Sequence, residues 1–317
     1  MRGHTPSERI LLAILLTFVV HVSLAGAQET PSSSPIEQLG PEARDALREL
    51  YAVDSSIPLD VRLVEKAPKE GLLREKLVFR GAQGFLVPAY LQLPPRPQGP
   101  FPCVLLLHGW SGSKENWWTD DNYISGGNVR KALIQSGYAV FALDAQAHGD
   151  RIAVNDYAPV NHFHDPALGP QQRKGYFTQR EIYIQTTRDY RRAIDYLLTR
   201  PEIDGTRLGA FGYSMGGAQT YLLCGTDPRL KCAVSCCAPK DASRYSPIAP
   251  QNFLPNIGQI PFLTIMGRND ELCPLSHALR MHELNPSPGK ELFILEAGHK
   301  FPHDFVPPAV EWLTTRL

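Results

Sequence analysis

The amino-acid sequence predicts an α/β fold in which helices cover both faces of a mostly parallel sheet. Short and nearly continuous apolar runs recur from about residue 101 onward, which is typical of strands buried on both faces of a sheet. Helical stretches separate these runs and indicate βαβ crossovers. The 317 residues, 43% of them hydrophobic, suffice to bury a core, and the formal net charge of zero provides no basic footprint for nucleic acid.

The amino-terminal residues predict an export signal. Arg2 and Arg9 precede an apolar run over residues 10–24, and a small-residue cleavage pattern ends at Ala27. The run is shorter than the roughly 20 apolar residues that a membrane-spanning helix needs, so no stable membrane anchor is expected. We therefore predict a signal peptide over 1–27, cleavage near Ala27 and a secreted or periplasmic protein.

A single domain is expected after a short linker. Residues 28–40 are polar and rich in Ser and Pro, which is typical of a linker. Pro41 suits the first position of a helix, and apolar residues at helical spacing extend that helix to about Val53. The stretch 41–317 then forms one α/β domain without an internal repeat.

The strand-like runs fall into two groups. Two runs with Gly81 and Gly84 between them predict a hairpin, and the later runs have the apolar character of parallel strands. The hairpin strands are expected at 75–80 and 84–94, and the parallel strands at 101–109, 138–146, 207–214, 230–237, 260–267 and 290–298. Helices are expected at 179–200, 216–225, 275–284 and 306–317.

Two long insertions leave the carboxyl ends of predicted strands, where open α/β sheets bind ligands. Residues 149–178 are irregular and too long for an ordinary connection, so they predict a lid or a substrate-facing loop. A second insertion covers 238–257. Asp144, His148 and Asp150 precede or begin the first insertion, and we expect them to buttress it and not to act in catalysis.

Ser214 lies in the pattern Gly212-Tyr213-Ser214-Met215-Gly216, between a predicted strand and a predicted helix. In this setting G-x-S-x-G places the Ser on a sharp turn, where the small residues let strand and helix pass closely. The amino end of the helix then directs free N–H groups and positive partial charge at the reacting centre. The pattern predicts a nucleophile and not merely a Ser in a Gly-rich turn.

A Ser nucleophile needs a His base and a carboxylate that orients the His. Asp270 and His299 each follow a predicted strand, and they give the chain order Ser, Asp, His. Glu271 and His303 are alternatives for the two roles, but each lies further from its strand end. We therefore predict a triad of Ser214, Asp270 and His299.

The oxyanion of a tetrahedral intermediate needs donors that are in place before it forms. The backbone N–H of Met215, next to the nucleophile, is the first donor expected. The second is the backbone N–H of Trp110, in the His108-Gly109-Trp110 loop after a predicted strand. His108 precedes Ser214 in the chain, and we expect it to pack beneath this loop instead of acting as a base.

These motifs resemble those of the α/β-hydrolase superfamily, in particular its dienelactone-hydrolase-like and acetyl-esterase-like branches. The motifs are LLLHGWSGSKEN, DAQAHGDR, GYSMGG, GRNDELCP and AGHKF, and the similarity extends from about Glu75 to the end of the chain. The resemblance implies an eight-stranded, mostly parallel sheet and hydrolysis by a Ser-His-acid triad. Dienelactone hydrolases proper have Cys where this chain has Ser214, and the multifunctional acetyl xylan deacetylases usually have Gln where it has Met215.

Aromatic residues near these motifs are candidates for a substrate pocket. Trp117, Trp118 and Tyr213 are the pocket candidates, together with Trp110 and Tyr123 beside the oxyanion loop. Aromatic side chains also fill cores, so burial in the core is the alternative for each of them.

No metal or other cofactor is expected. His162, His164 and Asp165 have the H-x-H spacing of metal ligands, but no further strong cluster accompanies them, and ordinary loop residues are the commoner case.

Six cysteines, an even number in a chain predicted to be exported, permit disulfides. Cys224 and Cys232 are the favoured pair because they would bridge a helix end and the next strand. Buried free thiols are the alternative, particularly for Cys103 within an apolar strand.

The sequence therefore predicts a secreted serine hydrolase that cleaves carboxylic esters through an acyl-enzyme intermediate. Small or medium esters, with acetyl esters of carbohydrates among them, are the expected substrates, and no nucleic-acid partner is expected. One alternative is a prolyl-oligopeptidase-like serine peptidase, because such catalytic domains share these motifs. The other is a non-catalytic α/β-hydrolase-like binding protein, for which a damaged triad would be expected.

Overall fold

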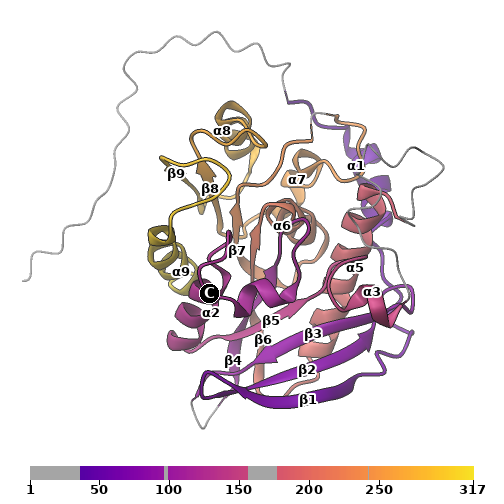
Figure 1. Cartoon of the computed structure of the whole chain (residues 1–317). Coiled ribbons are helices and arrows are strands. Elements are labelled where there is room, and N and C mark those ends of the chain that lie inside the picture. Colours follow the sequence, from indigo (N-terminus) through magenta and orange to yellow (C-terminus); the bar gives the residue numbers. More distant parts are fainter. Residues whose placement is uncertain (1–35, 96–98, 156–176, 242) are drawn as a thin grey trace, which may run out of the picture. The chain divides into compact units, whose positions relative to one another are not determined.

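A nine-stranded sheet with the strand order β1-β2-β3-β5-β4-β6-β7-β8-β9 forms the centre of the domain (Figure 1). The structure is a computed structural model that describes residues 36–95, 99–155, 177–241 and 243–317. Residues Pro35–Leu317 form one compact unit. The neighbours from β4 and β5 through to β9 run parallel, which confirms the predicted α/β class with a mostly parallel sheet.

The strands coincide with the predicted apolar runs except at one edge of the sheet. The antiparallel part comprises β1 (Arg62–Lys69), β2 (Leu72–Arg80) and β3 (Leu86–Gln92). The parallel part comprises β4 (Phe101–Leu107), β5 (Ala139–Leu143), β6 (Ile203–Tyr213), β7 (Leu230–Cys236), β8 (Phe262–Gly267) and β9 (Lys290–Leu295). The predicted hairpin is β2 and β3, and β3 also pairs antiparallel with β5.

The sheet has nine strands, one more than the eight that the resemblance implies. The additional strand is the edge strand β1, which no apolar run in the sequence marks. This strand pairs antiparallel with β2, from Arg62 opposite Val78 to Lys69 opposite Leu72. Its sequence, RLVEKAPK, mixes charged residues with short apolar ones, and most of them are exposed. Charged side chains on an edge strand discourage pairing with other chains, and the same charges remove the apolar signal of a strand.

Helices flank the sheet at the predicted positions, with additions. The longer helices are α1 (Pro41–Glu49), α2 (Gly126–Gln135), α5 (Gln179–Leu197), α6 (Met215–Thr226), α8 (Leu275–Leu284) and α9 (Val306–Thr314). The shorter segments are α3 (Arg151–Val154), α7 (Leu254–Ile257), η1 (Lys114–Trp118), η3 (Pro250–Asn252) and η4 (His303–Phe305). Helix α2 has no predicted counterpart because two glycines, which disfavour helix, begin it.

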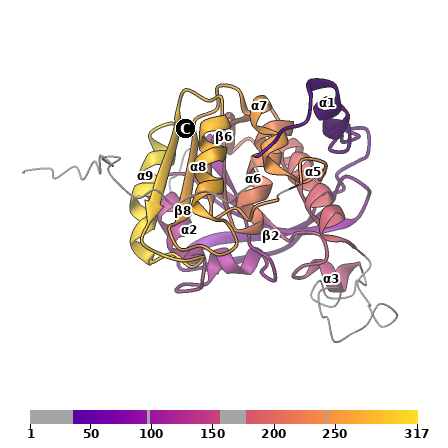
Figure 2. The same ribbon diagram turned by 90° about the horizontal axis from the view of Figure 1, so that it is seen from above.

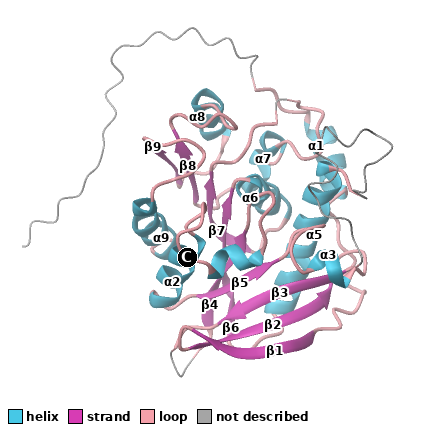
Figure 3. Ribbon diagram, viewed as in Figure 1, coloured by secondary structure: helices cyan, strands magenta, loops and turns pink. Residues whose placement is uncertain are grey.

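Alternate residues of the central strand β4 face two separate cores. Cys103, Leu105 and Leu107 lie in a core with residues of α5 and α6, whereas Val104 and Leu106 lie in a core with residues of α2 and α9. Successive side chains of a strand point to opposite faces, so both faces of this strand need covering helices. Figures 2 and 3 show α2 and α9 on one side of the sheet and α5 and α6 on the other.

The last residues of the predicted linker lie against the domain. The side chain of Gln38 donates a hydrogen bond to the backbone O of Gln251 at 2.7 Å. The N–H of Leu39 donates to Asn252 Oδ1 at 2.9 Å. These contacts attach the chain just before α1 to η3, within the second predicted insertion.

Two predicted segments lie wholly or partly outside the described residues. They are the signal peptide over 1–27 and the lid over 149–178, of which 156–176 is not described. The described ends of the lid segment are α3 and Thr178, which caps α5. None of the helices in the described part of the chain is long and apolar enough to cross a membrane.

All six cysteines are buried free thiols, so the predicted disulfide between Cys224 and Cys232 is wrong. Cys224 lies in the core on one face of the sheet, and Cys232 lies in the core on the other face. The sheet therefore separates two sulfur atoms that are close in sequence. Burial raises the pKa of all six thiols, that of Cys232 to about 12, which keeps them protonated.

A buried ion network ties the loop after β4 to the loop after β5. Lys114 Nζ donates to Asp144 Oδ2 at 2.8 Å and to Asp150 Oδ2 at 2.9 Å, and the side chains of Lys114 and Asp144 are both 0% exposed. The backbone N–H groups of Lys114 and Asp150 also donate to the Asp144 carboxylate. Burial alone would lower the pKa of Lys114, but the two carboxylates outweigh it and raise that pKa. Asp144 and Asp150 thus make structural contacts that join these two loops, while most of the insertion that they are predicted to buttress lies outside the described residues.

His108 lies beneath the same loop and links it to the loop after β5. Its Nδ1 lies 2.8 Å from the backbone O of Gly109, and its Nε2 lies 3.0 Å from the N–H of Ala145. This arrangement fits a neutral ring that donates from Nδ1 and accepts at Nε2. Burial lowers the pKa of His108 to about 4, so the ring stays neutral at physiological pH.

Replacing the buried cation should destabilise the protein strongly. Lys114→Met leaves the Asp144 carboxylate buried without its cation, and we expect the free energy of unfolding to fall by about 3–5 kcal/mol. As a control, Lys131→Met removes an exposed ion pair with Asp120 and should cost less than about 1 kcal/mol. Urea unfolding monitored by fluorescence measures both values. Equal losses in the two variants would contradict the importance of burial.

Acid should destabilise the protein through His108. The pKa is about 6.5 in the unfolded chain and about 4 in the folded one, so the unfolded state takes up its proton first as pH falls. The contribution is fully present above about pH 6.5 and is lost as pH falls toward 4, on the order of 2 kcal/mol between about pH 8 and pH 5. Urea unfolding at both pH values should show a smaller difference for His108→Asn than for the wild type. An unchanged difference would refute this assignment.

Candidate active site

Ser214 lies on a sharp turn between β6 and α6, with a left-handed φ of 56° and a ψ of −118°. Two glycines make this turn possible. A Cβ on Gly212 would lie 2.1 Å from the backbone O of Gly216, and a Cβ on Gly216 would lie 2.0 Å from the backbone O of Leu107. The N–H of Ser214 donates to the backbone O of Cys236 at 2.9 Å, which fixes the turn against β7. The geometry is that of a G-x-S-x-G turn.

Asp270 and His299 reach the same place from the loops after β8 and β9. His299 Nε2 lies 2.8 Å from Ser214 Oγ, and His299 Nδ1 lies 2.9 Å from Asp270 Oδ2. The other carboxylate oxygen of Asp270 accepts the N–H groups of Leu272 at 2.8 Å and Cys273 at 3.2 Å. Asp270 is thereby held with one oxygen free for His299. An anionic Asp270 favours the tautomer that donates from Nδ1 and accepts at Nε2.

The two alternative residues lie elsewhere. Glu271 is exposed. His303 Nδ1 lies 2.7 Å from Ser125 Oγ, and its Nε2 lies 3.6 Å from Asp121, so its ring faces the start of α2. The structure brings together Ser214, Asp270 and His299 but neither alternative.

Tyr213 is a buried residue that holds the His299 loop, so its prediction as a pocket residue is wrong. Its hydroxyl donates to the backbone O of His299 at 2.9 Å and accepts the N–H of Phe301 at 3.0 Å. The residue is 0% exposed, and its ring packs against Phe301 and Phe305. The nucleophile and the loop of its His partner are thus connected through the side chain that directly precedes Ser214.

Trp117 and Trp118 also belong to the core and not to a pocket wall. Trp117 is 0% exposed and packs edge-on against Phe211, with ring centroids 6.1 Å apart. Trp118 is 4% exposed, and its Nε1–H donates to Gln92 Oε1 at 3.0 Å. Both lie in η1, whose helical turn directs them inward. Two adjacent tryptophans in the sequence do not show whether their side chains line a pocket or fill the core.

The loop after β4 approaches Ser214 closely. A Cβ on Gly109 would lie 3.4 Å from the Cβ of Ser214 and 2.0 Å from the hydroxyl O of Tyr123. Trp110 follows Gly109, is partly exposed, and packs edge-on against His148 with ring centroids 5.5 Å apart. On the other side of Ser214, Met215 is the first residue of α6, where backbone N–H groups have no partner within the helix. Gly109, which precedes Trp110, and Met215, which follows the nucleophile, therefore both adjoin Ser214.

One further group at the site was not singled out by its sequence. Cys237 follows β7, and its Sγ donates to the backbone O of His299 at 3.6 Å. Cys237, Asp270 and His299 each offer an atom that can bind a metal, and these atoms lie within 4.8 Å of one another. The position of Cys237 directly after a predicted strand is the sequence feature that could have identified it. The H-x-H residues His162 and His164, with Asp165, lie outside the described residues.

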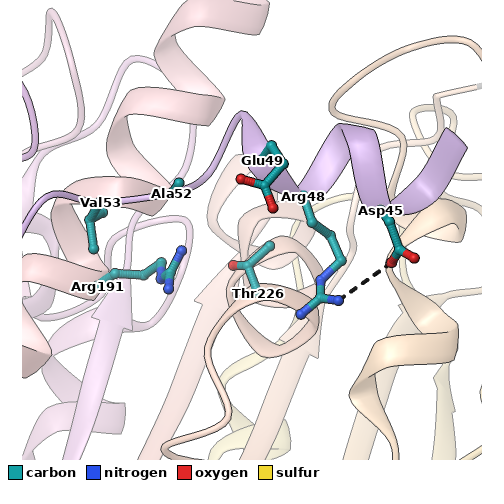
Figure 4. A pocket seen from close by; sticks show the side chains of 7 residues that line it. All are labelled: Asp45, Arg48, Glu49, Ala52, Val53, Arg191 and Thr226. Carbon is teal, nitrogen blue, oxygen red and sulfur yellow. Dashed lines mark ion pairs between the residues drawn. The ribbon is translucent and has the colours of Figure 1, made fainter. Parts of the chain in front are cut away.

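A large hollow of about 420 Å³ lies far from Ser214 along α6. Figure 4 shows its lining from α1, α5 and the last turn of α6, with Arg48 paired to Asp45 at 3.6 Å. Thr226 lies at the opposite end of α6 from Ser214. A helix of this length spans about 18 Å, so this hollow is not part of the candidate active site.

A second hollow, of about 360 Å³, lies between the start of α5 and the first turn of α6. It is lined from the start of α5, the first turn of α6 and the loop after β7, by residues that include Arg180, Tyr183, Ala218, Lys240 and Asp241. The N–H of Ala218 donates to the backbone O of Ser214 at 3.0 Å, so the hollow begins one turn from the nucleophile. None of Ser214, Asp270 and His299 lines it.

Known proteins share this fold and about a fifth to a quarter of the aligned residues. A protein of Bacillus subtilis strain 168 that carries the name hydrolase YtaP is 24% identical over 240 residues, which cover 68% of this chain and 76% of that protein. Acetyl xylan esterase 1 from Thermoanaerobacterium sp. JW/SL YS485 has a TM-score of 0.69 and 18% identity, covering 88% of this chain and 95% of that one. Acetyl xylan esterase from Paenibacillus sp. R4 has a TM-score of 0.66 and 20% identity, covering 90% and 97%.

The two solved structures show that the fold is that of α/β-hydrolases, as the sequence motifs imply. The sequence profile of the dienelactone hydrolase family matches residues 87–304, which is more than half of the chain and includes all of β4 to β9. The chain therefore belongs to the dienelactone hydrolase family.

Proposed function

We propose that the protein is a serine hydrolase that cleaves carboxylic esters through an acyl-enzyme intermediate. The observation that carries this proposal is the continuous chain of hydrogen bonds from Ser214 Oγ to His299 Nε2 at 2.8 Å and from His299 Nδ1 to Asp270 at 2.9 Å. Membership of the dienelactone hydrolase family supports it. A protein that only binds a ligand has no need for such an arrangement.

In the first half of the reaction, His299 Nε2 accepts the Ser214 proton while Oγ attacks the ester carbonyl. Asp270 holds the ring by its Nδ1–H and stabilises the imidazolium that forms. The backbone N–H groups of Met215 and Trp110 donate to the oxyanion of the tetrahedral intermediate. The intermediate collapses to the acyl-enzyme, and His299 transfers its proton to the departing alcohol.

In the second half, His299 removes a proton from water, and the hydroxide formed attacks the acyl carbon. The same backbone donors stabilise the second oxyanion. Collapse of this intermediate releases the carboxylic acid, and the proton returns from His299 to Ser214 Oγ. No step of this proposed reaction requires a cofactor.

The substrates that we propose are small or medium esters, with acetyl esters of carbohydrates as the first class to test. Two structural neighbours carry the name acetyl xylan esterase. The hollow between the start of α5 and the first turn of α6 is lined by the charged residues Arg180, Lys240 and Asp241, a combination that suits polyhydroxylated groups. The predicted signal peptide would place the enzyme where extracellular polymers occur.

Ser214→Ala should abolish hydrolysis of p-nitrophenyl acetate and of acetylated xylose. Without Oγ no acyl-enzyme forms, and kcat/KM should fall by at least about 1,000-fold. Ser136→Ala, at the exposed end of α2, is the matched control and should retain wild-type kcat/KM. Initial rates measured by absorbance, with a peptide p-nitroanilide as a second substrate, separate esterase from peptidase activity. Equal ester hydrolysis by Ser214→Ala and the wild type would disprove the mechanism.

Tyr213→Phe should lower kcat while leaving KM nearly unchanged. The substitution removes the hydroxyl that holds His299 O and the N–H of Phe301, so the base loses its fixed distance to Ser214. A displacement of about 1 Å can reduce the rate by roughly 100-fold. Tyr138→Phe removes a comparable hydroxyl contact to Thr314 and serves as the control. A rise in KM at constant kcat would instead favour a role in substrate binding.

A further inference from the structure

Cys237 is a buried thiol at the site that the proposed mechanism does not use. It directly follows β7 and has a left-handed φ of 38°. Its N–H donates to the backbone O of Ile265 in β8 at 2.8 Å, and its Sγ donates to the backbone O of His299 at 3.6 Å. These two bonds hold the thiol between the ends of β8 and β9, against the pair formed by Asp270 and His299.

Three ligand types converge at this point from the ends of three neighbouring parallel strands. The thiol of Cys237, a carboxylate oxygen of Asp270 and a ring nitrogen of His299 lie within 4.8 Å of one another. A tetrahedral Zn²⁺ ion holds such ligand atoms roughly 3.3–3.6 Å apart, so side-chain adjustments on the order of 1 Å would close the set. Asp270 is fully buried, and His299 is 26% exposed, which leaves an approach from the side of the ring.

We propose that Cys237, Asp270 and His299 form a site for a single Zn²⁺ or Cd²⁺ ion, and that the bound ion inhibits the enzyme. The sulfur, nitrogen and oxygen donors match these borderline and soft cations, whereas Mg²⁺ and Ca²⁺ prefer oxygen ligands alone. The charges balance: a thiolate and a carboxylate neutralise the divalent cation, and the imidazole stays neutral. Binding therefore releases one proton, that of the thiol, to solvent.

Inhibition follows from the tautomer of His299, and it rests on the proposed function. A metal ion on Nδ1 takes the place of the proton that Nδ1 shares with Asp270. In the neutral ring that proton then resides on Nε2, which lies 2.8 Å from Ser214 Oγ. Nε2–H can donate to Oγ but can no longer accept its proton, so the Ser is not activated.

Titration of the purified protein with CdCl₂ tests the site directly. Thiolate-to-cadmium charge transfer gives an ultraviolet absorption band, so binding is read without any substrate. We expect a band that saturates at one equivalent in the wild type and in the control Cys273→Ser, whose thiol lies outside the cluster. Cys237→Ser and Cys237→Ala should lose the band, and Cd²⁺ affinity should fall by more than the roughly 10–100-fold that loss of an outer-shell partner causes.

Hydrolysis of p-nitrophenyl acetate is measured in the same titration, with each variant compared to its own metal-free rate. Inhibition should follow the band in the wild type and in Cys273→Ser, and should require at least about 100-fold more Cd²⁺ in both Cys237 variants. No band, a band retained in folded Cys237→Ser or Cys237→Ala, or a band without inhibition would each overturn the proposal. If the protein proves inactive on esters, the proposed function fails, while the band still decides whether the metal site exists.

Discussion

The backbone turn at Ser214 is the constraint on which the arrangement of the site depends. Its positive-φ conformation exists because β6, α6 and β4 approach one another more closely than any side chain would allow at Gly212 and Gly216. The same approach brings the end of β4 to the nucleophile, and with it the loop that carries Trp110. Backbone strain of this kind costs on the order of 1–3 kcal/mol and persists only where surrounding structure imposes it. Here the two cores on either face of the sheet supply that structure.

Buried polar contacts, more than apolar ones, fix the loops around this turn. Tyr213 holds the loop of His299, Asp144 and Lys114 join the loops after β4 and β5, and His108 joins the same two loops a second time. Each contact satisfies groups that would be costly to bury alone. These contacts fix the position of each loop, because a loop that moves breaks a hydrogen bond and leaves a buried polar group without its partner. Apolar packing would tolerate a range of loop positions that these bonds exclude.

The features that the sequence predicts well are those that topology alone determines. Asp270 and His299 could be selected because the carboxyl ends of parallel strands meet at one edge of the sheet, so a residue just after such a strand lies near Ser214.

Roles that depend on the direction of a side chain could not be predicted. Tyr213, Trp117 and Trp118 are aromatic residues within or near functional motifs, and only the fold shows that their side chains are buried in the core. The disulfide between Cys224 and Cys232 fails for the same reason, since proximity in sequence does not say on which face of the sheet a sulfur lies. Strand β1 is not predicted because its charged residues interrupt the apolar pattern that marks the other strands.

The six enclosed thiols have a consequence for the conditions under which the chain can mature. Small exported domains often depend on disulfides and therefore on an oxidising compartment with its isomerases. This domain closes its cores by packing alone, with all six cysteine thiols buried and unpaired by disulfides. No covalent cross-link has to be formed, reshuffled or protected from reductant during folding. The folded domain therefore needs no oxidant to complete it, and a reductant removes no bond from it.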